Sequence, residues 1–225
     1  MRTRVAQSGD AAAIAAIYNQ GIEDRVATFE TRPRSPEDIR AWFDGTHPIV
    51  VVEQGHRIIA FASTSTYRPR ECYAGIAEFS VYVARDGRGR GAGRTAMEAL
   101  IREAARAGIW KLVSRVFPEN AASLRLLRSV GFREVGTYEK HARLDGVWRD
   151  VVIVERLIPA NLTPQRRKAR ARVPRLARAT EQPRRGRPRR GHSETDTASS
   201  VRRPRRRSST SGRQQRNSTA MTANA

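Results

Sequence analysis

A carboxylate, an apolar run and a loop rich in glycine and arginine follow one another in the middle of this 225-residue chain. Glu78 precedes the apolar run that ends at Val83, and residues 85–94 hold four glycines and four arginines. A helix-like pattern follows over 91–107. Glycines let a backbone approach a ligand closely, and the first N–H groups of a helix attract anions. This order of strand, loop and helix predicts a cradle for a phosphate or pyrophosphate group.

The segments around this unit predict a mixed α/β fold with mostly antiparallel strands and one strand–loop–helix crossover. Asp10 is the predicted N-cap of a first helix, and Ser35 marks the start of a second. Asp145-Gly146 is a hairpin-type turn. Apolar and β-branched runs predict strands near residue 5 and over 49–53, 58–66, 73–83, 110–117, 132–138 and 147–157, and helical spacing predicts further helices over 91–107 and 121–130.

The positive charge of the chain is concentrated at its C-terminal end. The formal net charge is +21, but residues 163–225 hold 19 of the 43 Lys and Arg residues and 3 of the 22 Asp and Glu residues, which leaves +5 for residues 1–162. Beyond residue 162 aromatic residues vanish and apolar periodicity stops. Such a segment buries too little apolar surface to offset the entropy lost on ordering. We therefore expect a folded domain over 1–162 and a disordered basic tail over 163–225.

The tail has two interpretations. Residues 185–188 read Arg-Gly-Arg-Pro and resemble an AT-hook, a short arm that binds narrow A·T minor grooves, and residues 202–207 form a second basic cluster. Charge alone also predicts non-specific, salt-sensitive contact with nucleic acid. The alternative is a solvated extension without a function of its own.

The cysteine, histidine and hydropathy patterns argue against several kinds of site. Cys72 is the one cysteine, so no intrachain disulfide can form, which fits a reducing cytoplasmic location. The four histidines show no metal-ligand spacing with one another or with Cys72, and we predict no metal site. No run approaches the roughly 18 apolar residues of a membrane span, and the start has no apolar signal region. We expect no membrane attachment.

Several ordered motifs resemble those of the GNAT N-acetyltransferases. Arg88-Gly89-Arg90-Gly91-Ala92-Gly93 is similar to the family's acetyl-CoA signature, Gln/Arg-x-x-Gly-x-Gly/Ala. Asn120-Ala121-Ala122-Ser123 and Gly131-Phe132 are similar to the family's second half. Residues 17–19, 29–33, 67–70 and 146–151 narrow the resemblance to the phosphinothricin N-acetyltransferase branch and the arsinothricin N-acetyltransferases close to it. The resemblance covers residues 2–158 and implies the GNAT fold, a mixed sheet flanked by helices.

The resemblance implies acetyl-CoA as co-substrate. The backbone N–H groups of the loop would hold the pyrophosphate, and arginine side chains would add charge. An opening in the sheet would let Val81 and Val83 pair with the pantetheine arm through their backbones, and the same strand would offer an N–H group to the thioester oxygen. Asn120 resembles the family's second cofactor contact. The expected cofactor-binding residues are Val81, Tyr82, Val83, Arg88, Gly89, Arg90, Gly91, Ala92, Gly93, Arg94 and Asn120.

Glu78 is the expected catalytic base, acting directly or through water. It is a carboxylate in an otherwise apolar segment, and partial burial would raise its pKa toward the working range. Leu127 stands where relatives carry an acid or base, and leucine cannot exchange a proton. Either Glu78 and water suffice, because a thiolate with a conjugate acid near pKa 8.5 leaves readily, or another residue serves, such as Tyr138 or His141.

The resemblance also implies a small acidic amino-acid substrate, acetylated on its amino group. Arg68 and Arg70 would contact its acidic end, because planar guanidinium groups suit carboxylate, phosphinate or arsinate oxygens; the alternative is two solvated loop arginines. Phe29, Thr31 and Tyr73 are at matching pocket positions.

Substrates of the phosphinothricin, arsinothricin or methionine sulfoximine and sulfone type would make the enzyme a resistance or detoxification protein, and the family implies a homodimer. The competing hypothesis is an acetyltransferase for a protein or another macromolecular amine, with a tail that binds nucleic acid.

Overall fold

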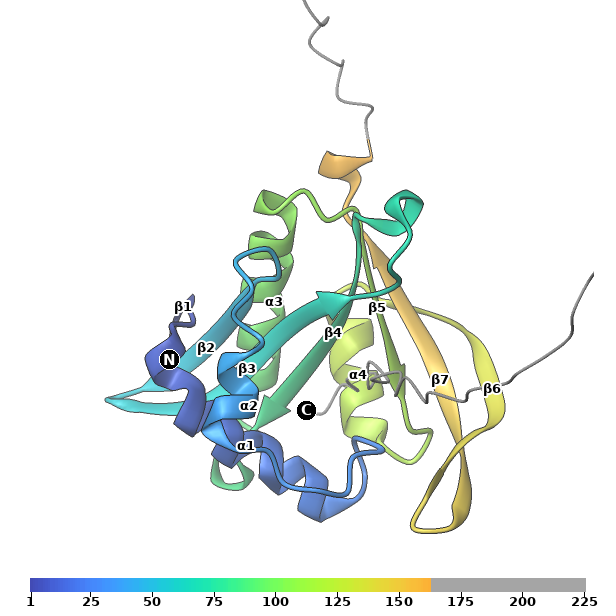
Figure 1. The fold of residues 1–225 in the computed structure, drawn as a ribbon, viewed down its shortest axis with the longest axis horizontal. Helices are drawn as coiled ribbons and strands as arrows, with labels where there is room; N and C mark the ends of the chain where they lie inside the picture. Colours follow the sequence, from blue (N-terminus) through green and yellow to red (C-terminus); the bar gives the residue numbers. More distant parts are fainter. Residues whose placement is uncertain (163–225) are drawn as a thin grey trace, which may run out of the picture. The chain divides into compact units, whose positions relative to one another are not determined.

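The strand order β1-β2-β3-β4-β5-β7-β6 runs across a seven-stranded sheet in residues 1–162, the part of the chain that the computed structural model describes (Figure 1). Within this sheet β4 and β5 are parallel, and every other neighbouring pair is antiparallel. The mixed, mostly antiparallel sheet predicted from the sequence is confirmed.

The strands are β1 (Arg2–Val5), β2 (Ile49–Gln54), β3 (Arg57–Thr66), β4 (Ile76–Val83), β5 (Lys111–Val116), β6 (Arg133–Leu144) and β7 (Val147–Leu157). The helices are α1 (Ala11–Asp24), α2 (Pro36–Arg40), α3 (Ala92–Arg106) and α4 (Ala121–Ser129).

The helices α1 and α2 begin where the sequence predicts, but only α2 is capped by the predicted side chain. Ser35 Oγ accepts a hydrogen bond from the N–H of Asp38, whose carboxylate accepts one from the N–H of Ser35. This reciprocal cap begins α2. Asp10 occupies the predicted N-cap position of α1, but its carboxylate accepts hydrogen bonds from Arg4 and from the N–H of Gln7. Asp10 therefore joins the turn before α1 to β1 and does not cap α1 with its side chain.

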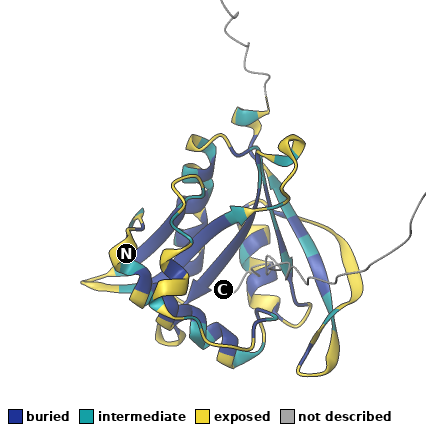
Figure 2. Cartoon of the chain, viewed as in Figure 1, coloured by how far each residue is buried: buried dark blue, intermediate teal, exposed yellow. Residues whose placement is uncertain are grey.

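Each face of the sheet carries its own apolar core, and Figure 2 shows the buried central strands between the helices. Successive strand residues point to opposite faces. Val81 and Val83 accordingly pack with the buried side of α3, while Tyr82 packs with α1 on the other face. All of β4 from Ala77 onward is buried. Polar groups on this strand therefore lie in a medium of low dielectric constant.

The pairing of β4 with β5 is short. Residues 76–78 pair with residues 111–113, and no β5 residue pairs with β4 beyond Glu78. Figure 1 shows the two ribbons separating from this point toward the carboxyl end of β4. The register thus locates the opening in the sheet that the family resemblance implies.

The β6–β7 hairpin is longer and less regular than predicted. Asp145 and Gly146 have φ angles of +48° and +82°, and they form the predicted turn. The sequence predicts a strand over 132–138, whereas β6 continues to Leu144. The pairing shifts between Tyr138 and Ala142, where β6 bulges. A bulge interrupts the alternation of side chains, and this is why the sequence pattern ends too early.

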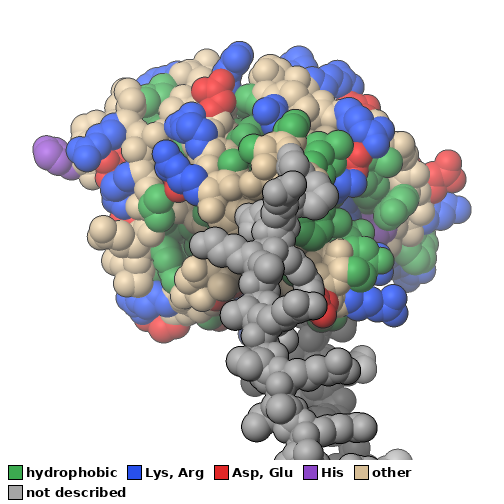
Figure 3. Space-filling view, turned by 90° about the horizontal axis from the view of Figure 1, so that it is seen from above, with side chains coloured by type: hydrophobic (Ala, Val, Ile, Leu, Met, Phe, Trp, Pro, Cys, Tyr) green, Lys and Arg blue, Asp and Glu red, His purple; other side chains and the backbone are tan. Residues whose placement is uncertain are grey.

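Charges of both signs lie on the face of residues 1–162 that is seen in Figure 3. Figure 3 shows Lys and Arg side chains dispersed among acidic, apolar and other groups. None of the helices described in residues 1–162 has the length and apolar character needed to cross a membrane. The basic tail, with its AT-hook-like motif and second basic cluster, lies outside the described residues.

Candidate active site

Backbone groups of β4 face the opening beside β5. The N–H of Ala84 donates to the carbonyl of Ile59 on β3 at 2.8 Å, and residues of an antiparallel pair face their partner strand alternately. Val81 and Val83 occupy the alternate positions, so their N–H and C=O groups point away from β3. On that side no described strand residue pairs with them.

The loop after β4 brings several N–H groups to one place. Gly89 and Gly91 have φ angles of +74° and +83°, which glycine adopts without strain. Gly91 precedes the first turn of α3, whose N–H groups have no partner within the helix. No described residue accepts a hydrogen bond from the backbone N–H groups of residues 88–93. An anion would meet these donors together with the positive end of the helix dipole.

The predicted loop arginines differ in their partners. Arg88 donates to Asp24 at 2.7 Å and to the carbonyl of Val83 at 3.2 Å, so its side chain links α1, β4 and the loop. Arg94 pairs with Glu98 at 2.9 Å. Arg90 is exposed and has no ion-pair partner among residues 1–162. Of these three arginines, Arg90 has the charge most open to an incoming anion.

Two residues predicted to contact the cofactor, Tyr82 and Asn120, contact other parts of the protein in the structure. Tyr82 faces β3 with its backbone, and its ring packs in the core under α1. It offers no group to the opening, in contrast to the prediction, because alternate residues face opposite sides. Asn120 accepts a hydrogen bond from the N–H of Ser123 at 3.0 Å and donates to the carbonyl of Val26 at 3.3 Å. The predicted cap of α4 by Asn120 is confirmed.

Glu78 forms a buried ion pair at the end of the β4–β5 pairing. Its side chain is 7% exposed, and one carboxylate oxygen accepts a hydrogen bond from Arg115 Nη2 at 2.6 Å. Burial raises the pKa of Glu78 above its ordinary value, and Arg115 offsets part of that rise. A carboxylate that is more basic than one in water is suited to accept a proton.

A cleft of about 340 Å³ opens beside this ion pair. Arg68 and Tyr73 line it together with Glu78, whereas Arg70 lies outside it. The guanidinium carbon of Arg68 is 5.3 Å from the ring centroid of Tyr67.

The other cleft cations are paired: Arg115 with Glu78, and Lys111 with Glu155 at 2.8 Å. Arg68 is the cleft cation that has no carboxylate partner within the described part of the chain.

Tyr138 and His141, the two residues that could transfer a proton in place of Leu127, also lie at this cleft. Leu127 is fully buried among apolar side chains. Tyr138 and His141 line the cleft of Glu78, with their ring centroids 5.5 Å apart. The slight burial of the largely exposed His141 ring, and then the nearby Arg115, lower the pKa of His141. Its imidazole is therefore neutral near pH 7.

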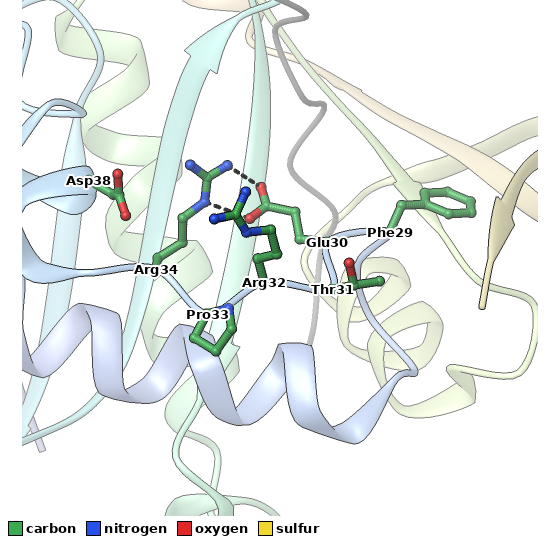
Figure 4. Close-up of a pocket in the computed structure, with 7 residues that line it drawn as sticks. All are labelled: Phe29, Glu30, Thr31, Arg32, Pro33, Arg34 and Asp38. Carbon is green, nitrogen blue, oxygen red and sulfur yellow. Dashed lines mark hydrogen bonds and ion pairs between the residues drawn. The ribbon is translucent and has the colours of Figure 1, made fainter.

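The segment between α1 and α2 lines a second pocket, of about 460 Å³ (Figure 4). Phe29 and Thr31 lie here and not with Arg68 and Tyr73. Figure 4 shows Glu30 and Arg34 facing each other, joined by hydrogen bonds of 2.6 and 2.8 Å. Phe29 points away from this pair, and its ring centroid is 6.1 Å from that of His141. Phe29 therefore connects the second pocket with the cleft of Glu78.

Sequence reasoning does not identify Arg115 as a site residue. The alternation of β5 indicates that Arg115 is on the less buried face, because Ser114 and Val116 are buried. Val113 pairs with Glu78, and Arg115 is two residues further along on the same face. Only the register between β4 and β5 brings Arg115 to Glu78. Among residues 1–162 no group of His, Cys, Asp or Glu side chains has a metal-binding arrangement.

Comparisons with known proteins match this geometry. The model of the Acetyltransferase (GNAT) family matches residues 15–132. The L-methionine sulfoximine/L-methionine sulfone acetyltransferase of Pseudomonas paraeruginosa (strain PA7) is 33% identical over 168 residues, covering 72% of this chain and 95% of the relative.

Two solved structures are similar over most of their length. The ribosomal-protein-alanine N-acetyltransferase from Brucella melitensis has a TM-score of 0.67 and 32% identity, covering 70% of this chain and 100% of its own. The GNAT superfamily phosphinothricin acetyltransferase from Sinorhizobium meliloti, solved in complex with acetyl-CoA, has a TM-score of 0.65 and 26% identity, covering 70% and 88%.

These matches confirm the resemblance to the GNAT family and to its phosphinothricin branch. The outward backbone groups of β4 and the unpaired N–H groups of the loop after it also fit the extended, anionic form of acetyl-CoA, the co-substrate of this family. The chain is therefore an acetyl-CoA-dependent acetyltransferase that belongs to the GNAT family.

Proposed function

We propose that this chain acetylates the amino group of a small acidic amino-acid analogue. The observation that carries the proposal is Arg68, which lines the cleft of the buried Glu78 and has no carboxylate partner among the described residues. A substrate with an amine at one end and an acidic group at the other matches a base and an unpaired guanidinium in one cleft. The names of two of the similar proteins contain analogues of this kind, phosphinothricin and methionine sulfoximine. Arsinothricin is a further substrate of the same type.

The cofactor side of the site consists mainly of backbone groups. Acetyl-CoA supplies the acetyl group as a thioester. Val81 would hold its pantetheine arm through its outward N–H and C=O groups, and Val83 through its outward N–H group, because Arg88 already donates to the Val83 carbonyl. The loop over residues 88–94 would hold the pyrophosphate. In this assignment Arg90 adds charge, while Arg88 fixes the loop to Asp24 and Val83.

The substrate side depends on side chains. Glu78 accepts a proton from the substrate ammonium, directly or through water, so that the amine can attack. Arg115 orients the Glu78 carboxylate through its hydrogen bond of 2.6 Å. Arg68 binds the acidic end, with Tyr73 in the wall beside it. Arg70 is not part of the proposed cleft.

Acetylation would remove the ammonium charge by which such an analogue resembles glutamate, and we assign the enzyme to resistance or detoxification. We also propose that residues 1–162 form the catalytic domain, because the family match and the proposed site both lie within them.

A thiol-release assay of the full-length chain tests the substrate class. The panel contains phosphinothricin, methionine sulfoximine, glutamate, an alanine-initiated peptide and a basic peptide. We expect turnover on the acidic analogues. Turnover on the peptides alone would refute the proposal and favour a protein acetyltransferase.

Arg68→Gln then tests the contact with the acidic end. The loss of a charged hydrogen bond should raise the KM of the acidic substrate roughly 10- to 100-fold and leave the KM of acetyl-CoA unchanged. Arg70→Gln is the matched control, because Arg70 is an exposed arginine outside the cleft. An equal change in both KM values would contradict the assignment of Arg68.

A further inference from the structure

A bulge interrupts β6 beside the cleft. From Tyr138 to Ala142, β6 advances by four residues, whereas its partner β7 advances by two, from Val151 to Arg149. Lys140 in this bulge has a φ angle of +47°, which is uncommon for residues other than glycine. The carboxylate of Asp150 on β7 accepts a hydrogen bond from the N–H of Lys140 at 2.7 Å. Asp150 therefore holds the bulge in its unusual conformation.

The bulge places His141 at the cleft. Bulges re-aim side chains and are common next to active sites. The imidazole lines the same cleft as Glu78. Its ring centroid is 5.5 Å from that of Tyr138 on the same strand and 6.1 Å from that of Phe29 on the α1–α2 segment. Contacts from two separate elements thus position the ring.

The charged groups around His141 leave its imidazole neutral and available. Slight burial of the ring and the nearby Arg115 lower its pKa. The cleft carboxylates do not reverse this effect, because Glu78 pairs with Arg115 and Glu155 pairs with Lys111. The titratable and charged groups that line the cleft with His141 are Tyr67, Arg68 and Tyr73 before β4, Glu78 on β4, Lys111 and Arg115 on β5, Tyr138 on β6 and Glu155 on β7. A neutral imidazole with a lowered pKa accepts a proton and releases it again readily.

We propose that His141 is the second proton-transfer group of the acetyl transfer, in the role that Leu127 cannot fill. This inference rests on the proposed function, because it requires an amine bound beside Glu78. A substrate ammonium loses two protons when its nitrogen becomes part of an amide. Glu78 accepts the first proton. His141 accepts the second.

The bonds and protons balance in this scheme. The nitrogen lone pair forms the C–N bond to the acetyl carbon, the C–S bond breaks, and its electron pair leaves on sulfur. His141 takes the proton from the nitrogen and passes it to the sulfur, which gives the free thiol. Glu78 releases its proton to solvent, so the net reaction yields the amide, the thiol and one proton.

His141→Ala in the full-length chain tests the proposal. We expect kcat/KM to fall about 100-fold, the effect of removing one acid–base group, with the KM of acetyl-CoA unchanged. Because His141 is exposed, free imidazole in the assay should reach the vacated space and raise kcat roughly tenfold or more. His56→Ala, in the exposed turn between β2 and β3, is the matched control and should keep wild-type activity without a response to imidazole.

The pH profile separates proton transfer from a structural role. Wild-type kcat should fall as the pH decreases through the lowered pKa of His141, because an imidazolium cannot accept a proton. His141→Ala should lose this dependence and regain one when imidazole is added. Asp150→Asn, which keeps an oxygen acceptor for Lys140, should retain more activity than Asp150→Ala.

Three results would overturn the proposal. The first is an activity of His141→Ala within about threefold of wild type, because removing an acid–base group has a much larger effect. The second is a loss of activity in His141→Ala that imidazole does not restore, and the third is a loss of activity in Tyr138→Phe that His141→Ala does not show. If the wild-type chain acetylates none of the acidic amino acids but does acetylate another amine of the panel, the substrate proposal fails. The comparison of His141→Ala with wild type on that amine then still decides the role of His141.

Discussion

The two ends of β4 present different kinds of chemical groups. At its carboxyl end, the outward groups of Val81 and Val83 and the glycine loop that follows offer main-chain donors and acceptors. Near its amino end, Glu78 depends on its side-chain ion pair with Arg115. Main-chain groups survive most side-chain substitutions, whereas a buried ion pair is lost with either partner. Substitutions at the amino end should therefore cost far more than those at the loop.

Glu78→Gln should give the largest effect. Glutamine keeps the shape of the side chain but cannot take up the proton, so kcat should fall about 10²- to 10⁴-fold, with the KM of acetyl-CoA unchanged. Steady-state kinetics across pH measure this. In the wild type, the Glu78 contribution should disappear as the pH falls through its raised pKa, and the variant should lack that dependence. Glu103→Gln on α3 is a carboxylate control outside both ends; near wild-type kcat in Glu78→Gln would remove the contrast between the two ends of β4.

Arg115→Met should cost stability at the same end. It leaves the Glu78 carboxylate buried without its partner, a loss of about 3–5 kcal/mol when the group is charged. The pKa of Glu78 should then rise further. Because a carboxyl with a raised folded-state pKa destabilises the fold as the pH rises, the loss should be small at pH 5 and larger at pH 8. Denaturant unfolding at both pH values measures this, and equal losses would show that Glu78 and Arg115 are not coupled.

Arg90→Ala should have a smaller effect, at the other end of β4. Its charge adds to N–H groups that remain in place, so the KM of acetyl-CoA should rise less than about tenfold, an exposed charge being worth roughly 1 kcal/mol. The increase should shrink further at high salt. Arg57→Ala, an exposed arginine paired with Asp86, serves as the control. A 100-fold increase for Arg90→Ala would mean that side-chain charge, and not the backbone, holds the pyrophosphate.

The contact between Asp44 and His47, away from both ends of β4, gives the smallest expected effect. Burial opposes ionisation of Asp44, but hydrogen bonds from His47 and from the N–H of Thr46 outweigh it and hold its pKa at about 2. The stability it contributes is present above its unfolded-state pKa and is lost as the pH falls through 2. Asp44→Asn should therefore cost only about 0.5 kcal/mol at pH 7, because the side chain is partly exposed. The difference from wild type should shrink by pH 2 in thermal unfolding; an unchanged difference would rule out this linkage.

Features that depend on neighbours along the chain are predicted correctly from the sequence, whereas features that depend on distant residues are not. The glycine loop, its helix and the caps at Ser35 and Asn120 depend on neighbours along the chain, and their places are predicted correctly. Glu78 is also recognisable, because a carboxylate in an apolar strand stands out. Its partner Arg115 is not recognisable from the sequence. Arg115 is 37 residues away from Glu78 along the chain, and only the register between β4 and β5 brings the two side chains together.

Side-chain direction and pocket membership are also set by tertiary structure. Tyr82 is adjacent to Val81 and Val83 in sequence, yet strand alternation turns its backbone toward β3. Phe29 and Arg68 have similar predicted roles but line different pockets. The bulge of β6 leaves no clear sequence signal, because Glu139, Lys140 and His141 are ordinary polar residues in an exposed strand.

The short β4–β5 pairing has a consequence for solubility as well. An unpaired strand edge on the outside of a protein invites association with other chains and aggregation. Here the unpaired part of β4 is in the middle of the sheet, with β5 and β7 beyond it and buried residues along its length. A second protein chain has poor access to such an interior edge, while a narrow, extended molecule can add to it as a strand would. The unpaired part of β4 is thus open to an extended small molecule and does not form an unpaired edge on the outside of the sheet.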